Sequence, residues 1–154
     1  MNKIKLAYAA GIIDGEGNIG IVKRRWSKRY DKYHLQVRVA MCDKEIPEWF
    51  LLHFGGSVST SCRSKINPKN RDLYTWQISH RKCIPMLQSI LPYLICKKSQ
   101  AELAIQFQDT KHYGGGIRGQ KGRPAKPDSE LAIEEERYLL MRQLKNNSHS
   151  SNNR

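Results

Sequence analysis

The sequence predicts an α+β domain in which helices cover one face of a four-stranded antiparallel sheet. Residues 34–41 alternate strictly, with Leu35, Val37, Val39 and Met41 on one side, which is the period of a half-buried strand. The expected strands come in adjacent pairs joined by short polar segments, and such hairpins require antiparallel pairing. Stretches with apolar residues at helical spacing precede, separate and follow these pairs.

The expected elements follow the order α-β-β-α-β-β-α-α-α, and no part of the chain repeats. With 154 residues the chain is long enough for one domain with a hydrophobic core. After the first helix, strands are expected at 18–26 and 34–41, a helix at 44–54, strands at 57–63 and 73–79, and helices at 82–91 and 98–108. Residues 1–112 form the expected core, 113–127 a Gly- and Pro-rich basic loop, 128–145 a C-terminal helix of the same domain, and 146–154 a disordered tail.

The formal net charge of +13 is concentrated in one part of the chain. Residues 1–126 hold 23 lysines and arginines against 9 aspartates and glutamates, whereas residues 127–154 have a balance of −1. A strongly basic folded domain indicates a polyanionic partner, with nucleic acid as the first candidate. No membrane role and no small-molecule substrate are expected, because no basic amphipathic helix stands alone and no apolar run approaches ~20 residues.

The four cysteines include no Cys-x-x-Cys pair, so neither a zinc ribbon nor a redox motif is indicated. Free buried thiols in a reducing compartment are the simpler interpretation. The first five residues run directly into the first expected helix and leave no room for a signal peptide. An intracellular setting is therefore expected, either an organelle (chloroplast or mitochondrion) or a bacterial or phage cytoplasm.

A helix with one narrow face of small residues ends at a single carboxylate, Glu16, which Gly15 and Gly17 flank. Such a helix approaches a partner more closely than the usual ~8–10 Å between axes. If the partner is an identical helix, two carboxylates meet near a two-fold axis. The alternative is a glycine-capped helix followed by a turn in which Glu16 is solvated. The face expected at the contact, at helical spacing, consists of Ala7, Ala10, Gly11 and Asp14.

Residues 9–17 resemble the LAGLIDADG motif of homing endonucleases. Gly11, Asp14 and Gly17 match its third, sixth and ninth positions, and Glu16 stands at the eighth, where aspartate is usual. The chain holds one copy of the motif. The resemblance therefore implies a homodimer with one motif helix from each subunit at the interface. It also implies that double-stranded DNA lies along a saddle formed by the two sheets.

The resemblance covers about residues 4–108 and implies a site-specific DNA endonuclease. The activity it implies is Mg²⁺-dependent hydrolysis of one phosphodiester in each strand of a long pseudo-palindromic target, leaving 3′ overhangs. Mn²⁺ is expected to substitute, and Ca²⁺ to support binding without cleavage. The gene is then expected to belong to a mobile genetic element, carried by an intron or an intein. A DNA-binding or RNA-splicing (maturase) protein on the same scaffold, without cleavage, is the alternative.

The matching positions also imply roles for individual residues. Glu16 and the carbonyl oxygen of Gly15 are expected to hold the metal, since hard divalent cations prefer oxygen ligands. Lys97 matches a lysine that reaches the active-site solvent and phosphate. Asp43 matches a polar or acidic residue near the metals, although it is equally well suited to cap the helix that follows it.

The outward face of the expected sheet carries many hydrogen-bonding groups and no carboxylate. Arg, Gln and Ser side chains read base edges, and Lys and Arg neutralise phosphates, so this face and the basic loop after the third strand are expected to contact DNA. A solvated face is the alternative. An unrelated RNA-binding module is disfavoured because outward aromatic side chains are scarce. The candidate DNA contacts are Val22, Arg24, Trp26, His34, Gln36, Arg38, Ser57, Ser59, Ser61, Arg63, Lys65, Lys69, Arg71, Thr75 and Gln77.

Overall fold

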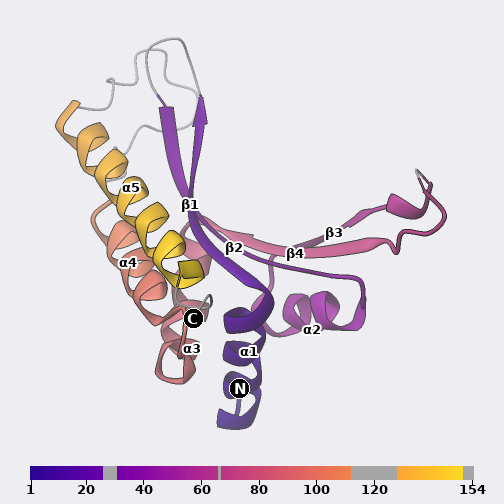
Figure 1. Ribbon diagram of the computed structural model, residues 1–154. Helices are drawn as coiled ribbons and strands as arrows, with labels where there is room; N and C mark the ends of the chain where they lie inside the picture. Colours follow the sequence, from indigo (N-terminus) through magenta and orange to yellow (C-terminus); the bar gives the residue numbers. More distant parts are fainter. Residues whose placement is uncertain (26–30, 66, 112–127, 151–154) are drawn as a thin grey trace, which may run out of the picture.

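A computed structural model describes residues 1–25, 31–65, 67–111 and 128–150. It confirms the predicted α+β class: an antiparallel sheet in the order β1-β2-β4-β3, with helices gathered on one side (Figure 1). The strands are β1 (Gly17–Arg25), β2 (Asp31–Met41), β3 (Ser57–Ser61) and β4 (Leu73–Ser79). The helices are α1 (Lys3–Glu16), α2 (Glu45–Phe54), α3 (Cys83–Ile90), α4 (Lys98–Asp109) and α5 (Asp128–Ser150), with 3₁₀ turns η1 (Arg63–Lys65), η2 (His80–Lys82) and η3 (Leu91–Tyr93).

Three boundaries differ from the predicted ones by more than one residue. β2 begins at Asp31, three residues early, and β3 ends at Ser61, so Arg63 lies in η1 and not on a strand. α5 continues to Ser150, so residues 146–150 are helical where a disordered tail was expected. The candidate contact Trp26 and the expected loop at 113–127 fall outside the described residues.

The register of the sheet separates an inward from an outward face. Ile19 pairs with Val37 and Val37 with Ile78, and directly paired residues share a face. Asn18 pairs with Arg38 on the opposite face, and Arg38 with Gln77. The alternation predicted for residues 34–41 is therefore correct: the odd-numbered positions from 35 to 39 are fully buried and the even-numbered ones face outward.

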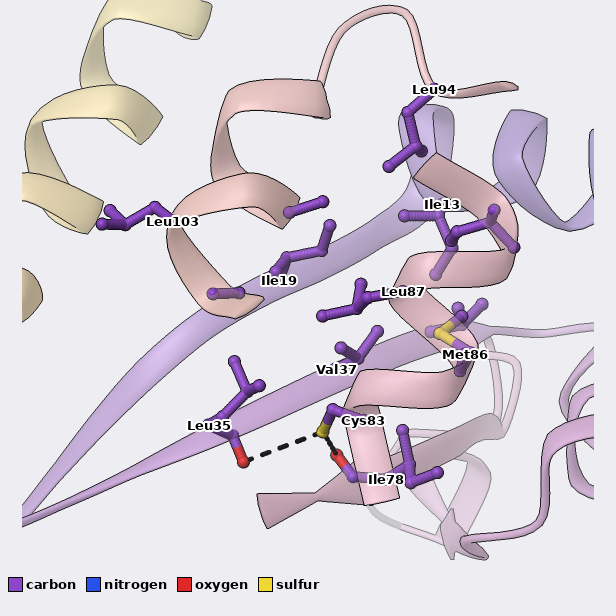
Figure 2. Close-up of a cluster of buried hydrophobic side chains, with 14 of the residues drawn as sticks. Ile13, Ile19, Leu35, Val37, Ile78, Cys83, Met86, Leu87, Leu94 and Leu103 are labelled. Atoms are coloured by element: carbon purple, nitrogen blue, oxygen red, sulfur yellow. Dashed lines mark hydrogen bonds between the residues drawn. The ribbon is translucent and has the colours of Figure 1, made fainter. Parts of the chain in front are cut away.

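The hydrophobic core lies between the inward face of the sheet and all five helices, with Phe50 contributed by α2 and Met141 by α5. Figure 2 shows Leu35, Val37 and Ile78 of the sheet facing Cys83 and Leu87 of α3. Each such side chain contributes about 1.5–3 kcal/mol when it is fully buried. Because the helices cover the inward face of the sheet, the outward face is the one that a ligand can reach.

The cysteines differ from the expectation of buried thiols. All four are free, but only Cys83 is buried, while Cys62 and Cys96 are exposed. The Cys83 thiol donates to the carbonyl oxygen of Ile78 at 3.3 Å, and burial raises its pKa to about 12. Within the described ranges, no helix combines the length and the apolar character that crossing a membrane requires.

The first helix is fixed at both of its ends. The Asn2 side chain accepts a hydrogen bond from the backbone of Lys5, which caps the N-terminus. At the other end, a Cβ atom on Gly17 would lie 2.6 Å from the Cα atom of Ile13. Only glycine fits there, so the chain turns from α1 into β1 immediately after Glu16.

Candidate active site

A cleft of about 320 Å³ opens where α1 meets β1. It lies at the outward side of the sheet, because Asn18 and Arg38 belong both to its lining and to that face. Glu16 is exposed and is the one carboxylate among the lining residues, whereas three of them carry cationic side chains. The lining consists of Gly15, Glu16, Gly17, Asn18, Arg38, Ala40, Lys97, Gln100 and Lys145.

Lys97 joins the cleft to the end of α1, as its predicted place in the site requires. Its Nζ atom donates to the carbonyl oxygens of Ile13 at 2.8 Å and Asp14 at 2.6 Å. Burial lowers the pKa of the Lys97 ammonium, while the Asp14 and Glu16 carboxylates act in the opposite direction. The structure thus brings two of the three predicted catalytic residues, Glu16 and Lys97, to one cleft.

Asp14 links α1 to the segment before α4. Its carboxylate accepts the backbone N–H groups of Ile95 at 2.7 Å and Lys97 at 2.9 Å. These contacts lie within one subunit, so Asp14 positions Lys97 whether or not a partner is bound. Its side chain is only partly exposed.

Replacing Asp14 with alanine should destabilise the fold by about 1–3 kcal/mol, because the exposed N–H group of Ile95 and the part-buried N–H group of Lys97 both lose a charged acceptor. Chemical denaturation measures this change in the free energy of unfolding. The exposed Asp109, replaced by alanine, is the matched control and should change stability by less than about 0.5 kcal/mol. Equal stability of the Asp14→Ala variant and the wild type would show that these bonds do not hold the junction.

The donors around Glu16 suit a hard divalent cation bound together with a substrate. No three His, Cys, Asp or Glu side chains gather into a metal cluster in the described ranges, so one chain offers a carboxylate and neighbouring main-chain oxygens. Mg²⁺ is usually held by one or two carboxylates plus substrate phosphates and water, rather than by an all-protein cage. The residues present therefore fit a cation whose coordination is completed by substrate phosphates and water.

Asp43 lies apart from this cleft. Its carboxylate accepts a hydrogen bond from the Arg71 guanidinium at 2.7 Å, and both side chains are more than half exposed. It does not cap α2 either, since Lys44 occupies the N-cap position without a side-chain bond. Neither of the two expected roles has geometric support, and the ion pair instead ties the basic loop to the start of α2. This pair is solvated and contributes little to stability.

The outward face carries the candidate DNA contacts as predicted. His34, Gln36 and Arg38 of β2 face outward, and Gln36 donates to the Gln77 side chain of β4 at 3.2 Å. His34 stacks on His80, with ring centroids 5.1 Å apart. Burial, followed by the charge of His80, lowers the pKa of His34 to about 4, so its ring is neutral at pH 7. Outward positions are also held by Val22, Arg24, Ser57, Ser59, Ser61 and Thr75.

The remaining candidates lie between β3 and β4. Arg63 and Lys65 are exposed in η1, and Lys69 is exposed in the following turn. Arg71, in the same segment, is engaged by Asp43. The segment between β3 and β4 lies at the far end of these two strands (Figure 1), and its exposed cationic residues extend the basic character of the sheet.

The small-residue face of α1 is rotated relative to the prediction. Ala7 and Gly11 are exposed as expected, but Ala10 is fully buried in the core and Asp14 binds its own chain. The exposed stripe runs instead through Ile4, Ala7, Gly11 and Gly15. Ala10 was assigned to the wrong side because a small residue packs as well against a close helix of its own subunit as against a partner.

Sequence reasoning missed three polar side chains of the cleft, those of Asn18, Gln100 and Lys145. The position of Lys145 near the end of a helix suits the helix macrodipole, and in the structure its Nζ atom donates to the Asn18 side chain at 2.9 Å. The spacing of the helix offered one signal: Lys145 lies on the same face of α5 as Glu134 and Met141, and these two residues are buried. Gln100 is 4 % exposed and carried no signal of its own.

Solved structures with the same architecture are homing endonucleases. I-CvuI, crystallised with the I-CreI target in 2 mM Mg with the DNA not cleaved, is 19 % identical, has a TM-score of 0.71, and is matched over 92 % of this chain and 82 % of its own. The archaeal intron-encoded I-Vdi141I, complexed with DNA, is 16 % identical with a TM-score of 0.57, over 88 % of this chain and 98 % of its own. The LAGLIDADG enzyme I-GzeII, in complex with its DNA target, is 20 % identical with a TM-score of 0.54, over 68 % of this chain and 35 % of its own. No protein-family model and no curated protein sequence matches the chain.

Proposed function

From the LAGLIDADG homing endonuclease fold that this chain has, we propose that the protein is a site-specific, homodimeric DNA endonuclease. It cleaves both strands of a long pseudo-palindromic target and leaves 3′ overhangs. One observation carries the proposal. Glu16, at the end of α1, lines a cleft with three cationic side chains, and Asn18 and Arg38 belong both to this cleft and to the outward face of the sheet. Solved relatives of this fold hold DNA.

The proposed dimer uses the exposed stripe of α1. A Cβ atom on Gly11 or Gly15 would meet no atom of the chain within 4 Å, so nothing in the subunit requires glycine there. Glycine inside a helix costs about 1 kcal/mol relative to alanine, and close approach of a second helix is one gain that offsets this cost. Ile4 and Ile95 are 80 % and 87 % exposed, which supplies apolar surface for a partner at both ends of the stripe.

Glu16 and Lys97 of the cleft then each have a task in phosphodiester hydrolysis. Glu16, with the Gly15 carbonyl, holds Mg²⁺ or Mn²⁺, which when bound polarises the phosphate, acidifies the attacking water and neutralises the leaving oxygen. Lys97 places a positive charge beside the phosphate, and its bonds to the α1 carbonyls fix the distance to Glu16. Ca²⁺ supports DNA binding without cleavage. The two Glu16 carboxylates of the dimer serve the two strands.

DNA recognition is proposed for the outward face. The described face presents guanidinium, amide, hydroxyl and neutral imidazole groups, which read base edges in the major groove. The exposed cations of η1 and of the turn at Lys69 contact phosphates and set the position of the duplex. The net charge of +13 supplies a long-range attraction for DNA.

Binding should weaken steeply as salt rises, because each cation that contacts a phosphate releases counterions. A plot of log affinity against log salt should be linear, with a slope near −0.9 for each phosphate contact. Lys69→Ala should weaken all DNA sequences about equally and make this slope shallower, whereas Arg38→Ala should change the base preference. Fluorescence anisotropy over a salt series measures both effects, and a flat response would contradict DNA binding.

The test of the proposed function is cleavage of a defined DNA. The substrate is a plasmid that carries the DNA flanking this reading frame, joined as it would be without the insertion that carries the gene. Purified protein with Mg²⁺ should linearise the plasmid at one site. Binding to one site without cleavage, in either Mg²⁺ or Mn²⁺, would instead favour the splicing or binding-only alternative. We also propose an intracellular setting, in an organelle or in a bacterial or phage cytoplasm, where such a mobile element resides.

A further inference from the structure

The C-terminal helix sends one lysine to the outward side of the sheet, although the helix itself packs beside α4 (Figure 1). Met141 of α5 is 1 % exposed in the core, and Glu135 forms an ion pair with Lys23 of β1 at 2.7 Å. These contacts anchor α5 along β1, the edge strand of the sheet. Lys145, one turn after Met141, passes this edge and donates to the Asn18 side chain at 2.9 Å.

β1 leaves room for this lysine at one position. Gly20 is outward-facing, and a Cβ atom there would lie 2.7 Å from Lys145 Nζ and 3.2 Å from Asn18 Oδ1. Glycine weakens a strand interior and often marks a place where another group approaches the backbone closely. Here the approaching group is the Lys145 ammonium. The absence of a side chain at Gly20 of β1 leaves the space that this lysine of α5 occupies.

The charges that line the cleft around this lysine favour a bound anion. Lys145 shares the cleft with the cations Arg38 and Lys97, against the single carboxylate of Glu16. Burial lowers the pKa of the Lys145 ammonium, and the charges of Arg38 and Lys97 lower it further. Gathering like charges in a half-buried cleft costs free energy, which a bound phosphate offsets by pairing with several of them.

We propose that Lys145 binds the phosphate that enters the cleft beside Glu16, so that the C-terminal helix supplies a phosphate ligand to the cleavage site. This inference rests on the proposed endonuclease function. The Lys145 ammonium donates to a non-bridging phosphate oxygen, and Asn18 orients it from the strand side. α5 is then a part of the active site and not only a cover for the core.

A charge-coupling experiment tests this contact without relying on cleavage. The purified full-length protein is titrated in EDTA with its target DNA, in which each central phosphate in turn is replaced by a neutral methylphosphonate. Wild type, Lys145→Met and Glu16→Gln are compared. Glu16 repels the phosphate of the cleft, so Glu16→Gln should tighten binding only when that phosphate is charged. The position at which Glu16→Gln no longer tightens binding therefore identifies the phosphate that lies in the cleft.

Lys145→Met should weaken binding to the charged target at least about tenfold, the usual size of a hydrogen bond to a charged group. This loss of affinity should disappear on one modified DNA only. That DNA carries the neutral methylphosphonate at the position where Glu16→Gln no longer tightens binding. Lys145→Arg should restore most of the affinity. Arg142→Met, an exposed cation one turn earlier on α5, is the control and should lose affinity equally on every DNA.

Two results would overturn the inference. One is an equal loss for Lys145→Met on all the modified DNAs, which would mean a general charge effect. The other is coupling to a phosphate different from the one that Glu16→Gln identifies. Gly20→Ala gives a second check, because it keeps the charge but displaces the ammonium, and it should reproduce the loss of coupling. Failure of the wild type to cleave is a separate result and counts against the proposed function alone.

Discussion

Replacing Glu16 with glutamine is expected to abolish DNA cleavage and to leave DNA affinity nearly unchanged. Glutamine keeps the size and hydrogen-bonding shape of the side chain but removes the charge that holds a divalent cation. Among the residues that line the cleft, no other carboxylate is available to replace it. A metal that stabilises developing charge is worth several kcal/mol, so the rate should fall at least about a thousandfold.

Cleavage of labelled target in Mg²⁺ measures the rate, and anisotropy in Ca²⁺ or EDTA measures the affinity. Glu102→Gln is the matched control, since Glu102 is an exposed carboxylate of α4 that does not line the cleft. Lys97→Ala should slow cleavage less severely, because Lys97 assists the metal and does not hold it. Its bonds to Ile13 and Asp14 mean that this variant also needs a stability measurement. Cleavage by Glu16→Gln at the wild-type rate would refute the assignment.

Gly11→Leu is expected to convert the dimer into monomers and to abolish double-strand cleavage. A Cβ atom at this exposed position meets no atom of its own subunit within 4 Å, so we expect the monomer to fold normally. In the proposed dimer it would hold the two α1 helices apart and separate the two Glu16 carboxylates. Gly11→Ala separates the effect on helix–helix contact from the effect on folding. It should raise the stability of the monomer by up to about 1 kcal/mol and still weaken the dimer.

Sedimentation over a concentration series measures the dimer, and circular dichroism confirms that the variants are folded. Gln106→Leu places a leucine at an exposed position of α4 and should leave the dimer intact. The proposed interface is wrong if Gly11→Leu sediments as the wild-type dimer. A wild-type protein that stays monomeric on its target DNA contradicts it equally.

The sheet could be predicted from the sequence because its signal is local. Strict alternation at residues 34–41 defines the faces of β2, and pairing then assigns the same faces to β1 and β4. Glu16 and Lys97 were found through a resemblance that carries residue positions with it. The structure confirms that both lie at one cleft.

What the sequence could not provide depends on tertiary contacts. Ala10 and Gly11 are adjacent small residues, and only the packing of α1 on the core decides which one is exposed. The Asp43–Arg71 ion pair joins segments 28 residues apart, and no local pattern marks it. Lys145 reaches the cleft because α5 is anchored along the edge of the sheet, and that placement is not encoded within the helix itself.

The hydrogen bonds that hold the cleft together also determine the stage of folding at which the cleft forms. The contacts from Lys97 to α1 join residues 83 and 84 positions apart, and the Lys145–Asn18 contact joins residues 127 positions apart. Closing such long loops is entropically costly, so these contacts form later in folding than the β1–β2 hairpin. During synthesis, Glu16 leaves the ribosome long before the lysines that complete its surroundings. An unfinished chain thus carries the acidic residue without the assembled centre, so the proposed nuclease activity requires synthesis to continue beyond Lys145.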